Sequence, residues 1–114
     1  MIEKMPRQVV FVSGAMTGLV NMNRKEFNKA QSYLEHYNHT VLNPAWFPDG
    51  LRHNDYLHMC FSMIDIADCI YVLRGSENSV GSKAEVTYAM NYGKGIYYQY
   101  ETCENQVPET AKIT

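Results

Sequence analysis

Short apolar, β-rich runs alternate with segments of helical periodicity along this chain of 114 residues. Residues 8–12 are apolar at almost every position, and so are residues 69–73. A strand without a polar face is buried on both sides, which is typical of a parallel sheet covered by helices. Helical connections between parallel strands are right-handed. The pattern therefore predicts an α/β fold: a small Rossmann-like (flavodoxin-like) three-layer domain with a parallel sheet of four to five strands.

The expected elements follow one another from residue 8 to residue 99. Strands are predicted at 8–12, 40–42, 69–73 and 96–99, and helices at 23–38, 56–67 and 79–92. Asn23 and Glu26 predict a capping pair at the first helix, and Asn38 tolerates the left-handed conformation that ends it. Ser79 is a good N-cap for the last helix. Residues 101–114 are polar and show no strong period, which favours an extended or mobile tail.

Size and composition limit the classes of function. The chain is long enough for one core, so residues 1–114 are expected to form a single domain. Ten basic and twelve acidic side chains give a net charge of -2, which argues against a surface for duplex nucleic acid. The three cysteines and four histidines lack metal-type spacing, so we expect no disulfide, no metal and no cofactor.

The pattern of hydropathy bears on location. No apolar run is long enough to cross a bilayer, and residues 1–7 lack the hydrophobic stretch of a signal peptide. We therefore expect a cytoplasmic protein without a membrane partner. Clustered tyrosines, among them Tyr97 and Tyr98, favour a subunit contact over base stacking, so a homo-oligomer is expected.

Two junctions between a strand and a glycine loop are expected at one rim of the sheet, where such folds bind ligands. Glycines and hydroxyls in the first loop suit phosphate or sugar oxygens, although a structural turn explains that loop about as well. The second loop opens the last helix, where free amides and the helix dipole attract an anion. The candidate ligand-binding residues are Ser13, Gly14, Met16, Thr17 and Gly18 in the first loop, and Ser79, Gly81 and Ser82 in the second.

Glu85 lies in the second turn of the last helix. Gly81 and Ala89, one turn away on either side, leave room for a ligand against its carboxylate. The alternative is a solvated glutamate that pairs with Lys83 or with a tyrosine hydroxyl, and composition alone favours that alternative.

Several of these segments, taken in order, resemble a known family. They are Val-Ser-Gly-Ala-Met-Thr-Gly at 12–18, Val-Leu-Asn-Pro-Ala at 41–45, Ala-Asp-Cys-Ile-Tyr at 67–71, Ser-Val-Gly-Ser-Lys-Ala-Glu at 79–85 and Gly-Lys at 93–94. In this order they resemble the DUF4406 group of bacterial and phage proteins. That group is similar to the nucleoside 2-deoxyribosyltransferases and the deoxynucleoside 5'-monophosphate N-glycosidases. The resemblance spans residues 9–98.

The resemblance implies a ligand and a reaction. In the related enzymes a glutamate at the position of Glu85 attacks the anomeric carbon of a deoxyribose and displaces the base, which is a coherent role for a carboxylate. The resemblance also implies that the loop from Ser13 to Gly18 contacts the base and sugar, and that Ser79 lies where the 5'-phosphate is held. The expected partner is a nucleoside or nucleotide. Hydrolysis and base exchange are not separated by the sequence.

One position departs from the pattern of those enzymes. They carry an aspartate eight residues before the aspartate that leads the third strand, here Asp68, and counting back gives Cys60. A thiol in an apolar helix does not replace a carboxylate. Asp55 is the catalytic candidate that reaches the rim if the preceding loop folds over, with His58 and Asp65 nearby. The alternative function is a catalytically inactive nucleotide-binding sensor, a sequestering protein or a regulator.

Overall fold

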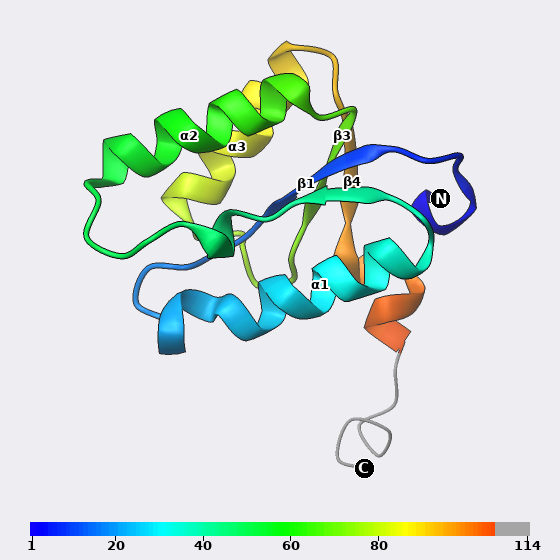
Figure 1. Cartoon of the computed structure of the whole chain (residues 1–114), viewed down its shortest axis with the longest axis horizontal. Coiled ribbons are helices and arrows are strands. Elements are labelled where there is room, and N and C mark those ends of the chain that lie inside the picture. The colour runs from blue at the N-terminus through cyan, green and yellow to red at the C-terminus, as the bar shows by residue number, and fades with distance from the viewer. Residues whose placement is uncertain (107–114) are drawn as a thin grey trace.

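The computed structural model describes residues 1–106. Four strands form one parallel sheet in the order β2-β1-β3-β4 (Figure 1). In chain order the main elements are β1 (Val9–Ser13), α1 (Arg24–His36), β2 (Thr40–Leu42), α2 (His53–Ile66), β3 (Cys69–Val72), α3 (Val80–Asn91) and β4 (Gly95–Tyr98). The predicted α/β class with a parallel sheet is thus confirmed, and the architecture is that of a small Rossmann-like domain.

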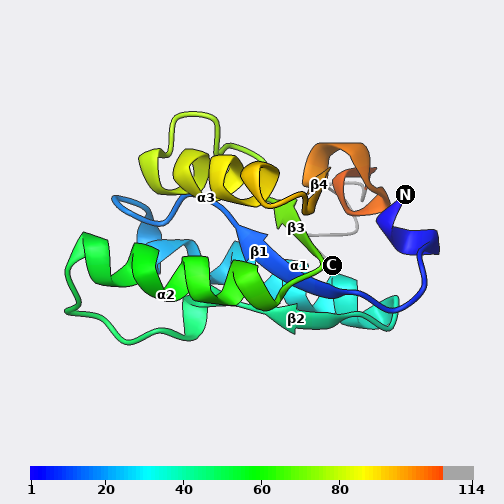
Figure 2. The same cartoon turned by 90° about the horizontal axis from the view of Figure 1, so that it is seen from above.

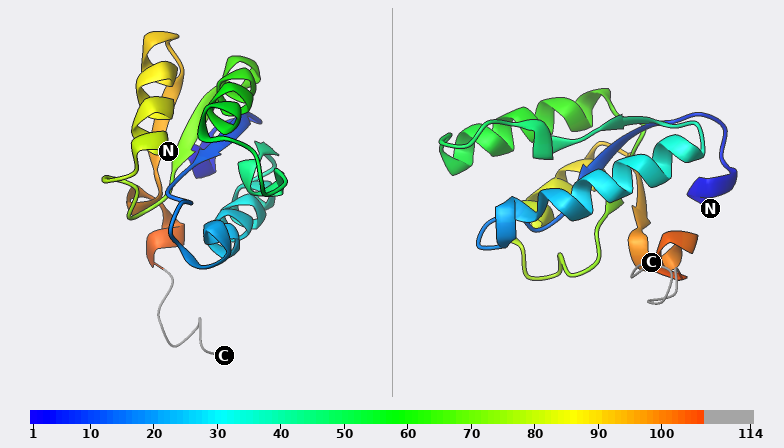
Figure 3. Two further views of the ribbon diagram at one scale, coloured as in Figure 1. Left: turned by 90° about the vertical axis from the view of Figure 1, so that its left-hand side faces the viewer. Right: turned by 60° about the horizontal axis from the view of Figure 1, so that its bottom comes forward.

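Alternate side chains of the central strands divide the core into two parts. Val10 and Tyr71 pack toward α1, whereas Phe11 and Ile70 pack toward α2 and α3. The helices supply Phe27, Ala30 and Leu34 to the first part, and Cys60, Ile64 and Ala89 to the second. Figure 3 shows α1 on one face of the sheet and the other two helices on the opposite face. Burial on both faces is why β1 and β3 are apolar throughout.

The topology opens a crevice between β1 and β3. The chain leaves β1 through α1 to β2 on one side, and it leaves β3 through α3 to β4 on the other. Ser13 pairs with Val72, so the carboxyl ends of the two strands are level. Figure 2 shows α2 and α3 side by side along the sheet. In open α/β sheets, ligands bind where neighbouring strands connect in opposite directions.

The helix ends agree with the sequence predictions in part. Ser79 is the N-cap of α3, and its hydroxyl accepts from the amide of Ser82 at 3.1 Å. Asn38 has a φ of 72°, the left-handed conformation expected after α1. The capping pair of Asn23 with Glu26 was wrong. The Asn23 side chain instead donates to the carbonyl of Ala15 at 2.9 Å and ties α1 to the loop after β1.

Residues 101–106 differ from the expected extended or mobile tail. Two short 3-10 turns, Gln99–Glu101 and Cys103–Gln106, close this end of the described chain. The Tyr71 hydroxyl donates to the Glu104 carboxylate at 2.6 Å, and the amide of Cys103 donates to Glu3 at 2.8 Å. The two ends of the described chain are therefore held together. The rest of the predicted tail, residues 107–114, lies outside the described residues.

Within residues 1–106, no helix combines the length and the hydropathy needed to span a membrane.

Candidate functional site

A cavity of about 500 Å³ lies at the crevice where β1 and β3 end. Its wall is formed by the loop after β1, the loop between β2 and α2, the first turns of α2, the loop after β3 and the start of α3. A concave site of this size at the switch point of an α/β sheet suits a small organic ligand.

The Glu85 carboxylate reaches this cavity from the second turn of α3. Its Oε1 accepts a hydrogen bond from the Ser13 hydroxyl at 2.7 Å, and that hydroxyl lies 2.8 Å from the hydroxyl of Ser82. The Cys60 thiol of α2 forms a further hydrogen bond with the carboxylate. Glu85 is only 8% exposed, so the alternative of a solvated pair with Lys83 does not describe it.

Burial sets the protonation of this group. Loss of solvation raises the pKa of Glu85 to about 7, and the hydrogen bonds with Ser13 and Cys60 act in the opposite direction. Glu85 is therefore present in both protonation states near neutral pH, which is typical of a carboxyl group that moves protons or attacks carbon. Burial also raises the pKa of Cys60 far above the ordinary value of a thiol, so Cys60 stays protonated beside the carboxylate.

The start of α3 forms one end of the cavity. Ser79, Val80 and Gly81 line it, and the first amides of an α-helix have no carbonyl partner within the helix. The helix dipole adds partial positive charge at this end. The geometry accordingly suits a negatively charged group of a ligand.

Gly14 allows the loop after β1 to cross the end of β3. A Cβ built at Gly14 would lie 2.8 Å from Cδ1 of Leu73, closer than side-chain carbons approach one another. Only glycine lets the backbone pass Leu73 here, so this part of the predicted loop has a steric reason for its composition.

The structure brings most of the predicted site residues together. The predicted residues that line the cavity are Gly14, Met16, Thr17, Ser79, Gly81, Ser82 and Glu85. Ser13 is fully buried and takes part through its hydrogen bond to Glu85 rather than by lining the wall. Gly18 does not line the cavity, and its φ of 81° serves the turn of the loop.

Asp55 does not lie where a catalytic partner of Glu85 would lie. Its carboxylate accepts from the backbone amide of Arg52 at 3.2 Å and from the Arg52 guanidinium at 3.1 Å, and these bonds lower the pKa of Asp55. Asp55 thus caps the start of α2 and is absent from the cavity wall. His58 and Asp65 do not line the cavity either. His53, two residues before Asp55 on α2, does line the cavity.

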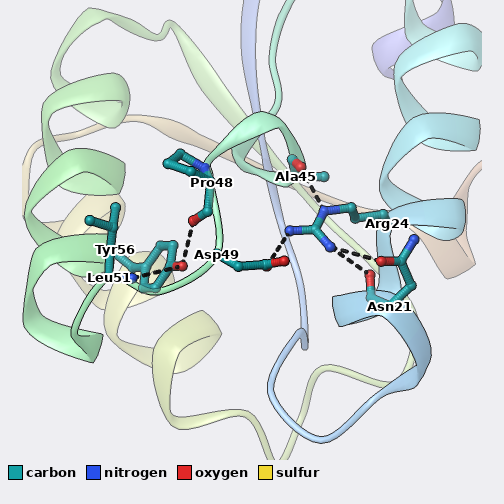
Figure 4. A network of polar contacts seen from close by, with 7 residues as sticks. All are labelled: Asn21, Arg24, Ala45, Pro48, Asp49, Leu51 and Tyr56. Carbon is teal, nitrogen blue, oxygen red and sulfur yellow. Dashed lines mark hydrogen bonds and ion pairs between the residues drawn. The ribbon is translucent and has the colours of Figure 1, made fainter.

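The loop between β2 and α2 forms a further part of the cavity wall, and two residues outside it hold it in place (Figure 4). Arg24, at the start of α1, donates to the carbonyl of Ala45 at 3.1 Å and pairs with Asp49 at 2.7 Å. From the other side, the Tyr56 hydroxyl donates to the carbonyl of Pro48 at 2.6 Å. Arg24 and Tyr56 therefore line the cavity and hold the loop in place at once. No motif marks either residue, because the partners are two backbone carbonyls and one exposed carboxylate, Asp49.

The chemical content of the wall is limited. Among the described residues that line the cavity, Glu85 is the only acidic one. Nowhere in residues 1–106 do three or more His, Cys, Asp or Glu side chains gather in a way that would hold a metal ion. Chemistry at this site therefore centres on one carboxyl group, surrounded by hydroxyls, a thiol and an imidazole.

A known protein family matches the part of the chain that contains the site residues. Residues 8–98 match DUF4406, described as a domain of unknown function, and this segment contains both loops and Glu85. Comparison with curated proteins found no significant match. Because the matched segment covers most of the chain, this protein belongs to the DUF4406 family.

Proposed function

We propose that this protein cleaves or exchanges the N-glycosidic bond of a nucleoside or nucleotide, with Glu85 as the nucleophile. The observation that carries the proposal is the place of Glu85, whose buried carboxylate borders a cavity of about 500 Å³ at the switch point of the sheet. The resemblance to the deoxyribosyltransferases and the deoxynucleotide N-glycosidases supports the same reaction.

The proposed chemistry uses the hydrogen bonds around the carboxylate. An oxygen of Glu85 attacks the anomeric carbon, the bond from that carbon to the base breaks, and the base leaves with the bonding electrons. Water or a second base then displaces the glutamate from the sugar, which regenerates the carboxylate. Ser13 donates to Oε1 and fixes the direction in which the carboxylate points. A fixed carboxylate loses less freedom when it reaches the reactive geometry.

The negative group of a nucleotide is proposed to bind at the start of α3. The hydroxyl of Ser79 and the first amide of the helix, that of Val80, belong to residues that line the cavity, and this helix start suits a 5'-phosphate. The Ser79 oxygen already accepts from the Ser82 amide, and its hydroxyl hydrogen is available to donate to an anion.

A nucleotide-binding protein without turnover is the second candidate, and Cys60 favours it. The related enzymes carry a carboxylate at this position, whereas here a thiol hydrogen-bonds with Glu85. A sensor or regulator keeps the cavity and needs no second acid. A cytoplasmic setting is proposed for both candidates, because three cysteines, an odd number without metal-type spacing, favour reduced thiols.

A homo-oligomer is part of the proposal as well. Large apolar side chains lie exposed on α3, among them Val80 at 74% and Met90 at 63%. Such side chains are buried at subunit contacts more often than on monomers. Sedimentation of the purified protein at several concentrations measures the assembly, and a monomer at all of them contradicts this part.

Release of free base tests the proposal directly. The protein is incubated with the deoxynucleosides and their 5'-monophosphates, and free base is measured by chromatography. Glu85→Gln keeps the shape of the side chain and removes the nucleophile, so its release is expected to fall by at least about 1000-fold. Glu35→Gln, an exposed change on α1, is the matched control and is expected to behave as wild type.

The outcomes separate the two candidates. Base release that depends on Glu85 supports the enzyme. Nucleotide binding, seen as a raised melting temperature, together with no release from any substrate, supports the sensor instead.

A further inference from the structure

The departing base needs a proton, and the hydrogen bonds described around Glu85 do not supply one. A purine or pyrimidine leaves with the electrons of the broken bond, and a proton delivered to a ring nitrogen stabilises it. Because Asp55 is absent from the cavity wall, the group that gives this proton must be sought elsewhere. The titratable side chains that line the cavity are Arg24, His53, Tyr56, Cys60 and Glu85.

Four of these groups are unsuited to give a proton. Arg24 is held by Ala45 and Asp49, and a guanidinium keeps its charge in proteins. The Tyr56 hydroxyl donates to the carbonyl of Pro48 at 2.6 Å. The Cys60 thiol has a pKa raised far above its ordinary value by burial, so it holds its proton too tightly. Glu85 is the nucleophile and must be ionised when it attacks.

His53 is the group that remains. In the part of the chain that the structure describes, no hydrogen bond engages its imidazole, and the side chain is exposed at the mouth of the cavity. Imidazole is the side chain that most often gives and takes protons near neutral pH. Nothing in the fold needs this ring as a partner, so its chemistry is available to a ligand.

The packing of α2 on α3 places His53 beside the first turn of α3, one helical turn before Glu85. A Cβ built at Gly81 would lie 3.8 Å from Cε1 of His53, so the ring is in contact range of the start of α3. Gly81 precedes Glu85 by one helical turn on the same face, a rise of about 6 Å. Along α2, His53 and Cys60 are seven residues apart and so share a face. The two helices thus meet at Cys60 and Glu85 on the floor, and at His53 and Gly81 at the mouth.

We propose that His53 is a catalytic residue that protonates the departing base, an inference that rests on the proposed function of the site. As Glu85 bonds to the anomeric carbon and the bond to the base breaks, the imidazolium of His53 gives its proton to a ring nitrogen of the base. The neutral imidazole then takes a proton from the water that displaces Glu85 from the sugar. The oxygen of that water stays on the sugar, and both side chains return to their starting states.

The experiment uses two substrates whose bases differ in their need for a proton. One is a purine deoxynucleotide. The other is the same deoxynucleotide methylated at N7, whose cationic base leaves as a neutral molecule without a proton. His53→Gln is compared with wild type and with His58→Gln, an exposed change on the same helix that does not line the cavity. We expect His53→Gln to lower kcat on the unmodified substrate on the order of 100-fold, and by less than about tenfold on the methylated one. His58→Gln is expected to match wild type on both.

Different results overturn the proposal in different ways. An equal loss of kcat on both substrates shows that His53 does not act on the leaving group. A raised KM with unchanged kcat on both assigns His53 to binding of the ligand and removes it from catalysis. If the wild type releases base from neither of these substrates nor from any of the other deoxynucleosides and 5'-monophosphates, the proposed function itself is overturned. If the wild type is active and His53→Gln matches it, only the role of His53 falls.

Discussion

Glu85 is a carboxyl group whose charge is decided by its surroundings. It is nearly buried, yet the described residues give it no cationic partner, only hydrogen bonds with Ser13 and Cys60. Loss of solvation therefore outweighs the hydrogen bonds, and its pKa rises to about 7. A buried carboxylate without an ion pair lowers the free energy of unfolding when it is ionised. Such groups are found at functional sites more often than at purely structural ones.

The first prediction concerns the stability of Glu85→Gln against pH. The folded-state pKa of Glu85, about 7, lies above its ordinary value of 4.5, so the protonated form is favoured by folding. The stabilisation that comes from protonated Glu85 is complete below the ordinary pKa and is lost as pH rises through about 7. Glutamine does not ionise, so the variant gains stability relative to wild type between about pH 5 and about pH 8, by up to about 3 kcal/mol. Urea unfolding at several pH values measures the difference.

The control for this prediction is Glu77→Gln, an exposed change in the loop after β3. Its stability relative to wild type is expected to stay constant over the same pH range. A constant difference for Glu85→Gln as well would contradict the raised pKa.

The second prediction concerns the hydrogen bond between Cys60 and Glu85. This bond lowers the pKa of Glu85 against the larger effect of burial, so Cys60→Ala is expected to raise that pKa further. Cys60→Ser keeps a donor at the same place and is expected to change the pKa less. Carbon-13 NMR of labelled glutamate carboxyl groups follows the titration without any need for turnover. An unchanged midpoint in Cys60→Ala would show that the thiol does not act on Glu85.

At the scale of the elements, α3 carries both the carboxylate and the proposed anion site. Ser79 begins the helix and Glu85 lies in its second turn, so one element sets the spacing between them. α2 packs beside it and supplies Cys60 at the floor and His53 at the mouth. The site is therefore built mainly on two helices, which hold side chains more rigidly than loops do.

The third prediction separates the two roles of Ser79. Ser79→Ala removes the acceptor of the Ser82 amide and is expected to cost about 1 kcal/mol of stability. Ser79→Asp keeps a capping acceptor, so its stability is expected to match wild type within a few tenths of a kcal/mol. Its negative charge repels a phosphate, so the stabilisation of Ser79→Asp by nucleotides is expected to disappear. Thermal unfolding with and without deoxynucleoside monophosphates measures both effects. A nucleotide shift that survives in Ser79→Asp places the phosphate elsewhere.

At the scale of the whole molecule, polar contacts join the two ends of the described chain on the face of the sheet covered by α1. The Tyr71 hydroxyl, from the middle of β3, lies 3.0 Å from the Thr102 hydroxyl and donates to Glu104. Glu3 accepts from Tyr33 and from the amide of Cys103. These contacts lie on the opposite face of the sheet from α2 and α3, so they stabilise the domain without taking part in the site.

The fourth prediction tests this network with Tyr71→Phe. The change removes one hydroxyl and leaves the buried Thr102 and Glu104 without that partner, so we expect a loss of about 1–3 kcal/mol. Amide exchange is expected to become faster in residues 99–104 and unchanged near Glu85. Tyr97→Phe, in β4, is the matched control and is expected to cost less than about 0.5 kcal/mol. An equal cost for both variants would contradict a role of the network in joining the ends.

The sequence by itself determined the architecture and the spacing of Ser79 and Glu85 along one helix. Apolar strands alternating with helices dictate a parallel sheet, because such strands lose water contact on both faces. Ser79 and Glu85 are separated by a fixed number of residues on one helix, so local geometry alone sets their relation. These features depend on short-range rules.

Only the tertiary structure decided which other groups meet Glu85. Asp55 and His53 are two residues apart on α2, and the packing of that helix turns His53 to the cavity and Asp55 toward Arg52. Arg24 binds the same loop through the carbonyl of Ala45 and the carboxylate of Asp49, and Tyr56 binds it through the carbonyl of Pro48. Contacts between residues far apart in the chain leave no local period to detect, because they arise only when the layers pack together.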